Sequence, residues 1–123
     1  MEAYFEKVIP NMRNIDFKCH FRLERGTVEI LCEKIVTLNM VIRKRLPLKK
    51  QVLITLWLLA TPDSYWSIGD RFGVPKSSVY CSVRRIVDAL YELAPQAIRW
   101  PNGGEVNETI DGFKQLNNFP GVI

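Results

Sequence analysis

Residues 64–91 have the sequence SYWSIGDRFGVPKSSVYCSVRRIVDALY, which predicts a short helix, a tight turn and a longer helix. Ser64 can cap the first helix, because its hydroxyl can accept a hydrogen bond from an unpaired first-turn amide. Gly73 stands where the end of a helix often requires a positive φ. Pro75 lacks the amide hydrogen that the entry to a helix leaves unpaired. The stretch therefore contains both the stop of one helix and the start of the next.

The second of these helices has two unlike faces. Its apolar residues recur at helical spacing and form one stripe, which consists of Val79, Val83, Ile86, Val87 and Leu90. The opposite face carries small polar and charged residues, which are Ser77, Ser78, Cys81, Arg84, Arg85 and Asp88. This layout is typical of a helix-turn-helix, in which the first helix braces and the second enters the major groove of DNA. The alternative is a pair of packed helices with a solvated outer face.

We therefore expect the second helix to contact double-stranded DNA through its entry and its polar face. Arginine and serine there can meet base edges or phosphates. The predicted DNA-binding residues are Lys76, Ser77, Ser78, Cys81, Arg84 and Arg85.

A basic run lies before the helix pair. Residues 43–50, RKRLPLKK, hold five basic residues and no acidic one. Such a run can contact phosphates, serve as an import signal, or only be solvated. Contacts to the phosphate backbone add affinity without sequence choice. Our hypothesis assigns this role to Arg43, Lys44, Arg45, Lys49 and Lys50.

The remaining periodicity is helical as well. Residues 24–38 carry apolar side chains on one helical face. Residues 49–60 are apolar over more than half of the circumference, so we expect a central helix with Trp57 in the core. Polar residues 11–18 indicate a connector, and 105–116 a short helix. With no strand pattern, the sequence predicts an all-α small helical bundle containing the helix-turn-helix. The expected divisions are a loose N-terminal segment at 1–16, the helical domain at 17–101, and a loop with a short helix at 102–123.

Composition narrows the class of protein. The 123 residues carry a formal net charge of +4, which modestly favours an anionic partner. The three cysteines are odd in number and scattered, which indicates reduced thiols in an intracellular protein. Cys19, His20 and Cys32 lack the paired spacing of a zinc site. The longest apolar run, 52–60, is too short to span a bilayer, so we expect no membrane partner.

A series of short motifs runs through the chain. They are HFRL at 20–23, LP at 46–47, LWLLAT at 56–61, SYWSIG at 64–69, FGV at 72–74, KSSV at 76–79, IRWP at 98–101, GF at 112–113 and FPGVI at 119–123. Their joint order, over residues 17–123, resembles the N-terminal part of a Harbinger transposase-derived nuclease.

The resemblance implies a helix-turn-helix region in front of a ribonuclease-H-like nuclease domain, whose acidic triad holds a divalent metal, usually magnesium. The family's first catalytic aspartate lies in an Ile-Asp-Gly-Thr-His motif after the Phe-Pro-Gly-Val segment, and these residues end before that motif. Asp111 lies in an Ile-Asp-Gly sequence, but Phe113 and Lys114 follow it, so no catalytic role carries over. We therefore expect no catalytic, metal or cofactor site within these residues, and expect magnesium only for the absent nuclease domain.

Two partners and a location follow from the same resemblance. Double-stranded DNA is the first partner, and a Myb-like protein is the second, since such proteins accompany transposases of this group. We expect a nuclear protein, with the cytoplasm as the alternative location. Asp88 and Glu92 oppose a DNA duplex by their charge, so a helical module that docks a Myb-like protein stays open as an alternative. A truncated piece of a full metal-dependent nuclease is the third hypothesis.

Overall fold

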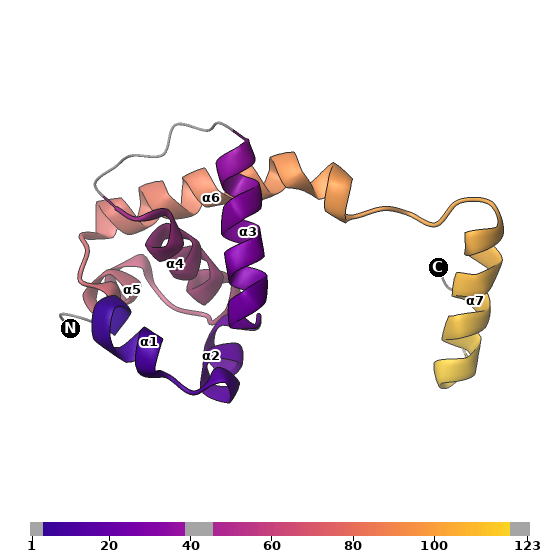
Figure 1. The fold of residues 1–123 in the computed structure, drawn as a ribbon, viewed down its shortest axis with the longest axis horizontal. Coiled ribbons are helices and arrows are strands. Elements are labelled where there is room, and N and C mark those ends of the chain that lie inside the picture. The colour runs from indigo at the N-terminus through magenta and orange to yellow at the C-terminus, as the bar shows by residue number, and fades with distance from the viewer. Residues whose placement is uncertain (1–3, 39–45, 119–123) are drawn as a thin grey trace. The chain divides into compact units, whose positions relative to one another are not determined.

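The computed structural model describes residues 4–38 and 46–118, and all regular structure among them is helical (Figure 1). In chain order the elements are η1 (Tyr4–Val8, a π-helical turn), α1 (Ile9–Asn11), α2 (Asn14–Phe21), α3 (Arg25–Thr37), α4 (Leu48–Ala60), α5 (Tyr65–Phe72), α6 (Lys76–Ala97) and α7 (Gly104–Asn117). The prediction of an all-α small bundle is confirmed. The chain divides into two compact units, residues 1–93 and residues 94–123.

Helix α4 is the centre of the first unit. It contacts α2, α3 and α5, which surround it in Figure 1. The helix buries seven residues, because apolar side chains occupy more than one of its faces; they are Lys50, Gln51, Val52, Leu53, Ile54, Thr55 and Trp57. The sequence pattern indicated this central place, but it gave no sign that Lys50, Gln51 and Thr55 would be buried with the apolar residues.

Trp57 is the hub of the aromatic core. Its ring meets those of Tyr4, Phe21 and Phe72 edge to face, at centroid distances of 6.4, 5.9 and 6.5 Å. The guanidinium carbon of Arg71 lies 4.5 Å from the centre of the Trp57 ring. Edge-to-face pairs contribute about 0.5–1.5 kcal/mol each beyond the area that they bury. Trp57 therefore joins α2, α4 and α5 to the N-terminal turn.

The N-terminal residues take part in this core. Tyr4 and Ile9 are 4% and 2% exposed, although we expected the first sixteen residues to be loose. Arg25 holds the segment down, since its Nη2 donates to the carbonyl of Ile9 at 2.8 Å and to that of Met12. Helix α2 occupies residues where the polar sequence had indicated a connector. Only Phe17 and Phe21 are buried on α2, and so short an apolar stripe is easily overlooked.

The stretch 64–91 forms two helices joined by a tight turn. The Oγ of Ser64 accepts from the backbone N–H of Ser67 at 3.1 Å, so Ser64 caps α5. Gly73 ends α5 with a φ of 69°, a backbone conformation that favours glycine. Gly69 also has to be glycine, because a Cβ there would lie 2.6 Å from the carbonyl oxygen of Val74. A left-handed backbone thus explains Gly73, and the close approach of the turn to α5 explains Gly69.

Helix α6 packs on the first unit through one stripe, which consists of Val79, Ser82, Val83, Ile86, Ala89 and Leu93. Val87, which we had placed in the apolar stripe, is 41% exposed. The helix continues through Pro95 to Ala97. A stripe of this spacing turns the opposite face of α6 toward solvent.

The second unit consists of the end of α6, a connecting segment and α7. None of the α7 residues is buried. Glu105 organises the start of α7, since it pairs with Arg99 at 3.7 Å and accepts from the backbone N–H of Asn102 at 3.4 Å. A short helix was expected at residues 105–116, and the helix found there is one residue longer at each end.

Candidate nucleic-acid interface

The polar face of α6 presents most of the residues that we predicted to bind DNA. Lys76, Ser77, Cys81 and Arg84 are exposed, and Ser78 is half-buried. All five belong to the first three turns of α6. The buried stripe that starts at Val79 fixes the rotation of this helix and so turns these residues away from the core. The helix entry and the polar face are thus brought together on one surface, which we call the α6 face.

Arg84 and Arg85 have different environments although they are neighbours in sequence. Arg84 is exposed on the α6 face. Arg85 is half-buried, and its Nη1 donates to the Oε1 of Gln51 on α4 at 2.8 Å. Gln51 is fully buried, so this bond draws the Arg85 guanidinium toward the edge of α4. The helical pattern predicted that both arginines would extend into solvent, and of the two only Arg84 does so.

Two lysines of the basic run, Lys49 and Lys50, have different environments. Arg43, Lys44 and Arg45 lie outside the described residues. Lys49 is exposed and forms an ion pair with Glu29 of α3. The side chain of Lys50 is only 10% exposed, its Nζ lies 3.4 Å from Glu6 Oε1, and it stands 5.4 Å from the centre of the Phe5 ring. Lys50 therefore joins α4 to η1, and its burial leaves little of its ammonium group for a phosphate.

The α6 face also carries acidic and aromatic side chains. Asp88 and Glu92 are exposed. Tyr80 is 49% exposed, and Tyr91 is 79% exposed. Tyr80 and Tyr91 were not among our predicted site residues, although together with Arg84 and Val87 they follow the helical spacing of one outward row. That row could have been found by listing which positions the buried stripe leaves outside.

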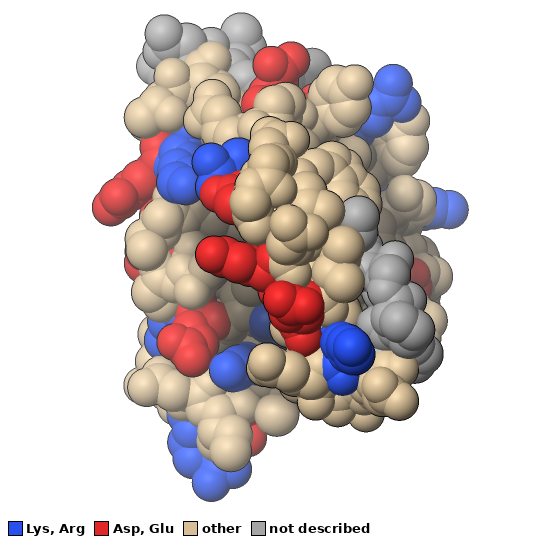
Figure 2. Space-filling model, turned by 90° about the vertical axis from the view of Figure 1, so that its right-hand side faces the viewer, with Lys and Arg blue, Asp and Glu red and all other residues tan. Residues whose placement is uncertain are grey.

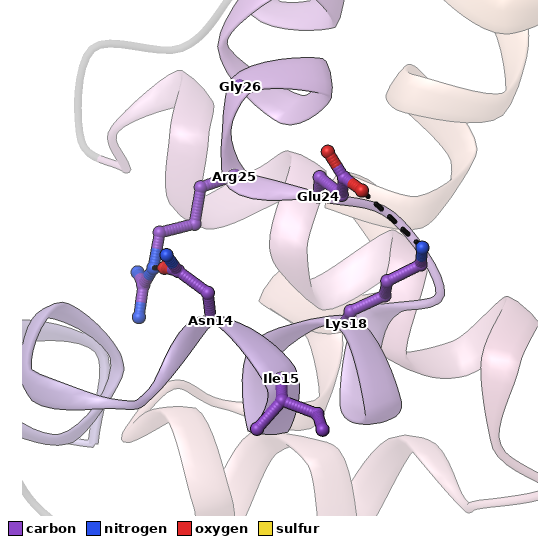
Figure 3. Close-up of a pocket in the computed structure, with 6 residues that line it drawn as sticks. All are labelled: Asn14, Ile15, Lys18, Glu24, Arg25 and Gly26. Carbon is purple, nitrogen blue, oxygen red and sulfur yellow. Dashed lines mark hydrogen bonds and ion pairs between the residues drawn. The ribbon is translucent and has the colours of Figure 1, made fainter.

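The shallow pockets on the described residues of the first unit include the following two. The larger, of about 470 Å³, lies between α2 and α3 and is lined by Asn14, Ile15, Lys18, Glu24, Arg25 and Gly26 (Figure 3). Its polar groups bond to one another, since Lys18 pairs with Glu24 at 3.4 Å and Arg25 donates to Asn14 at 3.1 Å. This pocket therefore has few free groups with which to hold a ligand.

The smaller pocket, of about 310 Å³, lies where α5 begins, and it is lined by Leu58, Asp63, Ser64, Tyr65, Trp66 and Lys76. It joins Lys76 of the α6 face to Trp66, which is 71% exposed. Asp63 is an acceptor here, because the N–H of Trp57 bonds its carboxylate and, with the backbone N–H of Ser64, lowers its pKa. The α6 face thus continues onto the start of α5.

Charges of both signs occur on the surface. The face drawn in Figure 2 carries acidic as well as basic side chains, so the net charge of +4 is not displayed there as one basic surface.

Among residues 4–38 and 46–118, no three His, Cys, Asp or Glu side chains gather as a metal site would require. Within the same residues no helix is both long and apolar enough to cross a membrane. All three cysteines are free thiols, and burial raises the pKa of Cys32.

Comparison with known proteins identifies a relative in a plant. The protein antagonist of like heterochromatin protein 1 from Arabidopsis thaliana is 30% identical over 122 aligned residues. The alignment covers 91% of this chain but 31% of that protein, so the chain spans less than a third of the relative's length. No family model matches the chain, and no solved structure matches it. The similarity is therefore to one segment of a longer protein.

Proposed function

We propose that this chain is a double-stranded DNA-binding module of a Harbinger-type, transposase-derived protein, in which α5 and α6 act as a helix-turn-helix. The observation that carries the proposal is the rotation of α6. Its valine and isoleucine stripe is buried, and this leaves Lys76, Ser77 and Arg84 on one exposed face of the helix. A helix fits into the major groove, and small polar and basic side chains at its N-terminal end complement the negative charge of the DNA.

Each part of the interface has a different task in this proposal. Arg84 and the serines at the helix entry meet base edges or phosphates. Arg85 adds a phosphate contact at the edge of the α6 face. Lys49 adds another, and so do Arg43, Lys44 and Arg45 of the basic run. Phosphate contacts position a protein on the duplex and make its affinity depend on salt. Non-specific affinity should then be about 10⁻⁴ to 10⁻⁶ M at physiological salt.

The name of the Arabidopsis relative refers to a heterochromatin protein, and this supports a nuclear location. The transposase-derived origin rests on the order of the short sequence motifs, which also implies a nuclear location. Magnesium-dependent nuclease activity belongs, in this proposal, to a domain outside these residues. No role in catalysis is assigned to any residue described here.

Fluorescence anisotropy with a labelled random-sequence DNA duplex tests the proposal directly. The wild-type chain should bind at low salt, and the double variant Arg84→Ala with Arg85→Ala should bind weakly or not at all. Lys7→Ala with Lys34→Ala is the matched control, because it also removes two exposed positive charges, and neither residue belongs to α5 or α6. Absence of binding by the wild-type chain at low salt, or equal binding by the double variant, would falsify the proposal.

A second candidate function is docking of a protein partner on the α6 face. The observation that favours it is the outward row of Tyr80, Val87 and Tyr91, accompanied by the acidic Asp88 and Glu92. Exposed aromatic side chains are enriched in protein interfaces. The relative's name describes it as an antagonist of like heterochromatin protein 1, so a chromatin protein is one candidate partner. The Myb-like protein that the motif resemblance implies is the other. Retention of such a protein by the immobilised chain, lost on Tyr91→Ala with DNA binding absent, would favour this function over the first.

A further inference from the structure

Gln51 is a buried polar residue of α4, and most of the other buried side chains of this helix are apolar. Its exposed fraction is 0%, and both ends of its amide group are hydrogen-bonded. The Nε2 donates to the carbonyl oxygen of Leu46 at 2.9 Å, and the Oε1 accepts from Arg85 Nη1 at 2.8 Å. Burial of an amide is unfavourable unless such partners are present. A leucine or methionine would fill the same space without requiring them.

The two bonds connect three separate parts of the first unit. Leu46 precedes α4 by two residues, Gln51 lies in the second turn of α4, and Arg85 lies in the middle of α6. Arg85 and Gln51 are 34 residues apart in sequence. The amide therefore holds one guanidinium of the α6 face against α4 and fixes the approach of the chain to α4 at the same time.

Arg85 keeps donor capacity after this bond forms. A guanidinium group has five N–H donors in a planar fork and carries its charge at all ordinary pH values. Among the residues that the structure describes, Gln51 is the hydrogen-bond partner of Arg85, and it accepts from a single nitrogen. Because Gln51 is neutral, it orients the guanidinium without cancelling its positive charge. A carboxylate in the same place would orient the group and neutralise it.

We propose that Gln51 is a positioning residue for DNA: it holds Arg85 at the edge of the α6 face so that the remaining donors meet a backbone phosphate. This inference rests on the proposed function. It adds that the interface contains one pre-oriented arginine, Arg85, beside one freely extended arginine, Arg84. Orientation before binding reduces the side-chain entropy that is lost when the contact forms.

A double-mutant cycle separates positioning from a general structural role. Gln51→Met removes both hydrogen bonds at similar volume, and we expect its affinity for a random-sequence duplex to fall severalfold at low salt. The same substitution in an Arg85→Ala background should cause no further loss, because the residue to be positioned is absent. A purely structural role would instead lower affinity by the same factor in both backgrounds, and that result would overturn the inference.

Gln51→Glu supplies a second measurement if the methionine variant folds poorly. The carboxylate can still accept from Arg85 but cannot donate to the carbonyl of Leu46, and it cancels the charge that a phosphate would meet. We expect the slope of log affinity against log salt to decrease in magnitude by about 0.9, the value for one phosphate contact. Arg85→Ala should show the same decrease, whereas Lys34→Ala should show none. An unchanged slope in Gln51→Glu would overturn the inference.

The outcomes for the wild-type chain distinguish this inference from the proposed function. If the wild-type chain binds the duplex and the Gln51 variants bind equally well, only the positioning role of Gln51 fails. If the wild-type chain does not bind at all, the proposed function fails and the inference fails with it. Melting temperatures by circular dichroism should accompany each titration, so that only folded variants enter the comparison.

Discussion

The indole N–H of Trp57 donates a hydrogen bond of 3.1 Å to Oδ2 of Asp63, and this bond links the core of the first unit to the turn before α5. Oδ1 of the same carboxylate accepts from the backbone N–H of Ser64, the residue that caps α5. The buried helix α4 thus sets where α5 begins. Since the turn after α5 leads directly into α6, the position of the candidate interface depends on this polar contact as well as on apolar packing.

Replacement of Trp57 should be among the most destabilising single changes in the first unit. Trp57→Ala removes the edge contacts to three rings, the stacking on His20 at 5.3 Å and the bond to Asp63. Large-to-small changes of this kind cost about 3–5 kcal/mol. Urea unfolding followed by circular dichroism measures the loss. Leu59→Ala, which truncates an exposed leucine of the same helix, is the control and should change stability by less than about 0.5 kcal/mol.

The Trp57–Asp63 bond predicts a dependence of stability on pH. The bond to Trp57 is the largest cause that lowers the pKa of Asp63 below its ordinary value of 3.8. A carboxyl group whose pKa is lower in the folded state stabilises the fold above its unfolded pKa, and this contribution disappears as pH falls through the folded value. The melting temperature should therefore fall on acidification below about pH 4.

Asp63→Asn identifies how much of that acid dependence belongs to this group. An asparagine oxygen can still accept from Trp57 but does not titrate in this range. The variant should be less stable than the wild-type chain at neutral pH and should lose less stability on acidification. Identical profiles for the two proteins would contradict the assignment.

Two glycines should respond to alanine in opposite directions. In Gly69→Ala the new Cβ meets the carbonyl oxygen of Val74 at 2.6 Å, so the turn between α5 and α6 must shift. Overpacking of this kind costs about 1–3 kcal/mol. In Gly26→Ala of α3 the new Cβ meets nothing within 4 Å, and alanine is the better helix former by about 0.5–1 kcal/mol. Thermal melts of the two variants should therefore shift to opposite sides of the wild-type value.

Lys49 and Lys50 should differ in their effect on DNA affinity although they are adjacent. Lys49 is exposed and its partner Glu29 is also exposed, so a phosphate can compete for it. Lys50 is buried against Glu6 and Phe5. Lys49→Met should reduce the magnitude of the salt slope of binding by about 0.9. Lys50→Met should leave that slope unchanged and affect stability instead, and a reduced slope for Lys50→Met would contradict its placement within the fold.

Local chemistry determined the parts of this protein that the sequence predicts best. Some features depend only on residues that are close in sequence, and the helices form as these features predict. They are the N-cap at Ser64, the helix end at Gly73 and the helical spacing of Val79, Val83 and Ile86. The continuous apolar circumference of residues 49–60 likewise predicted the central helix. The sequence did not indicate α2, because its two buried side chains, Phe17 and Phe21, produce no clear period. For the same reason residues 4–11 could be interpreted either as a short helix or as a loose end.

Only the tertiary structure decided which polar side chains belong to the interior. Helical periodicity places Arg85 on the outer face with Arg84, but the buried amide of Gln51 draws it toward α4. The pattern of charges places Lys50 in a basic run, but Glu6, which lies 44 residues away, brings it into the fold. Periodicity reports the direction of a side chain from its own helix. The partner that a flexible, charged side chain reaches depends on how separate helices pack, and this is decided by the fold as a whole.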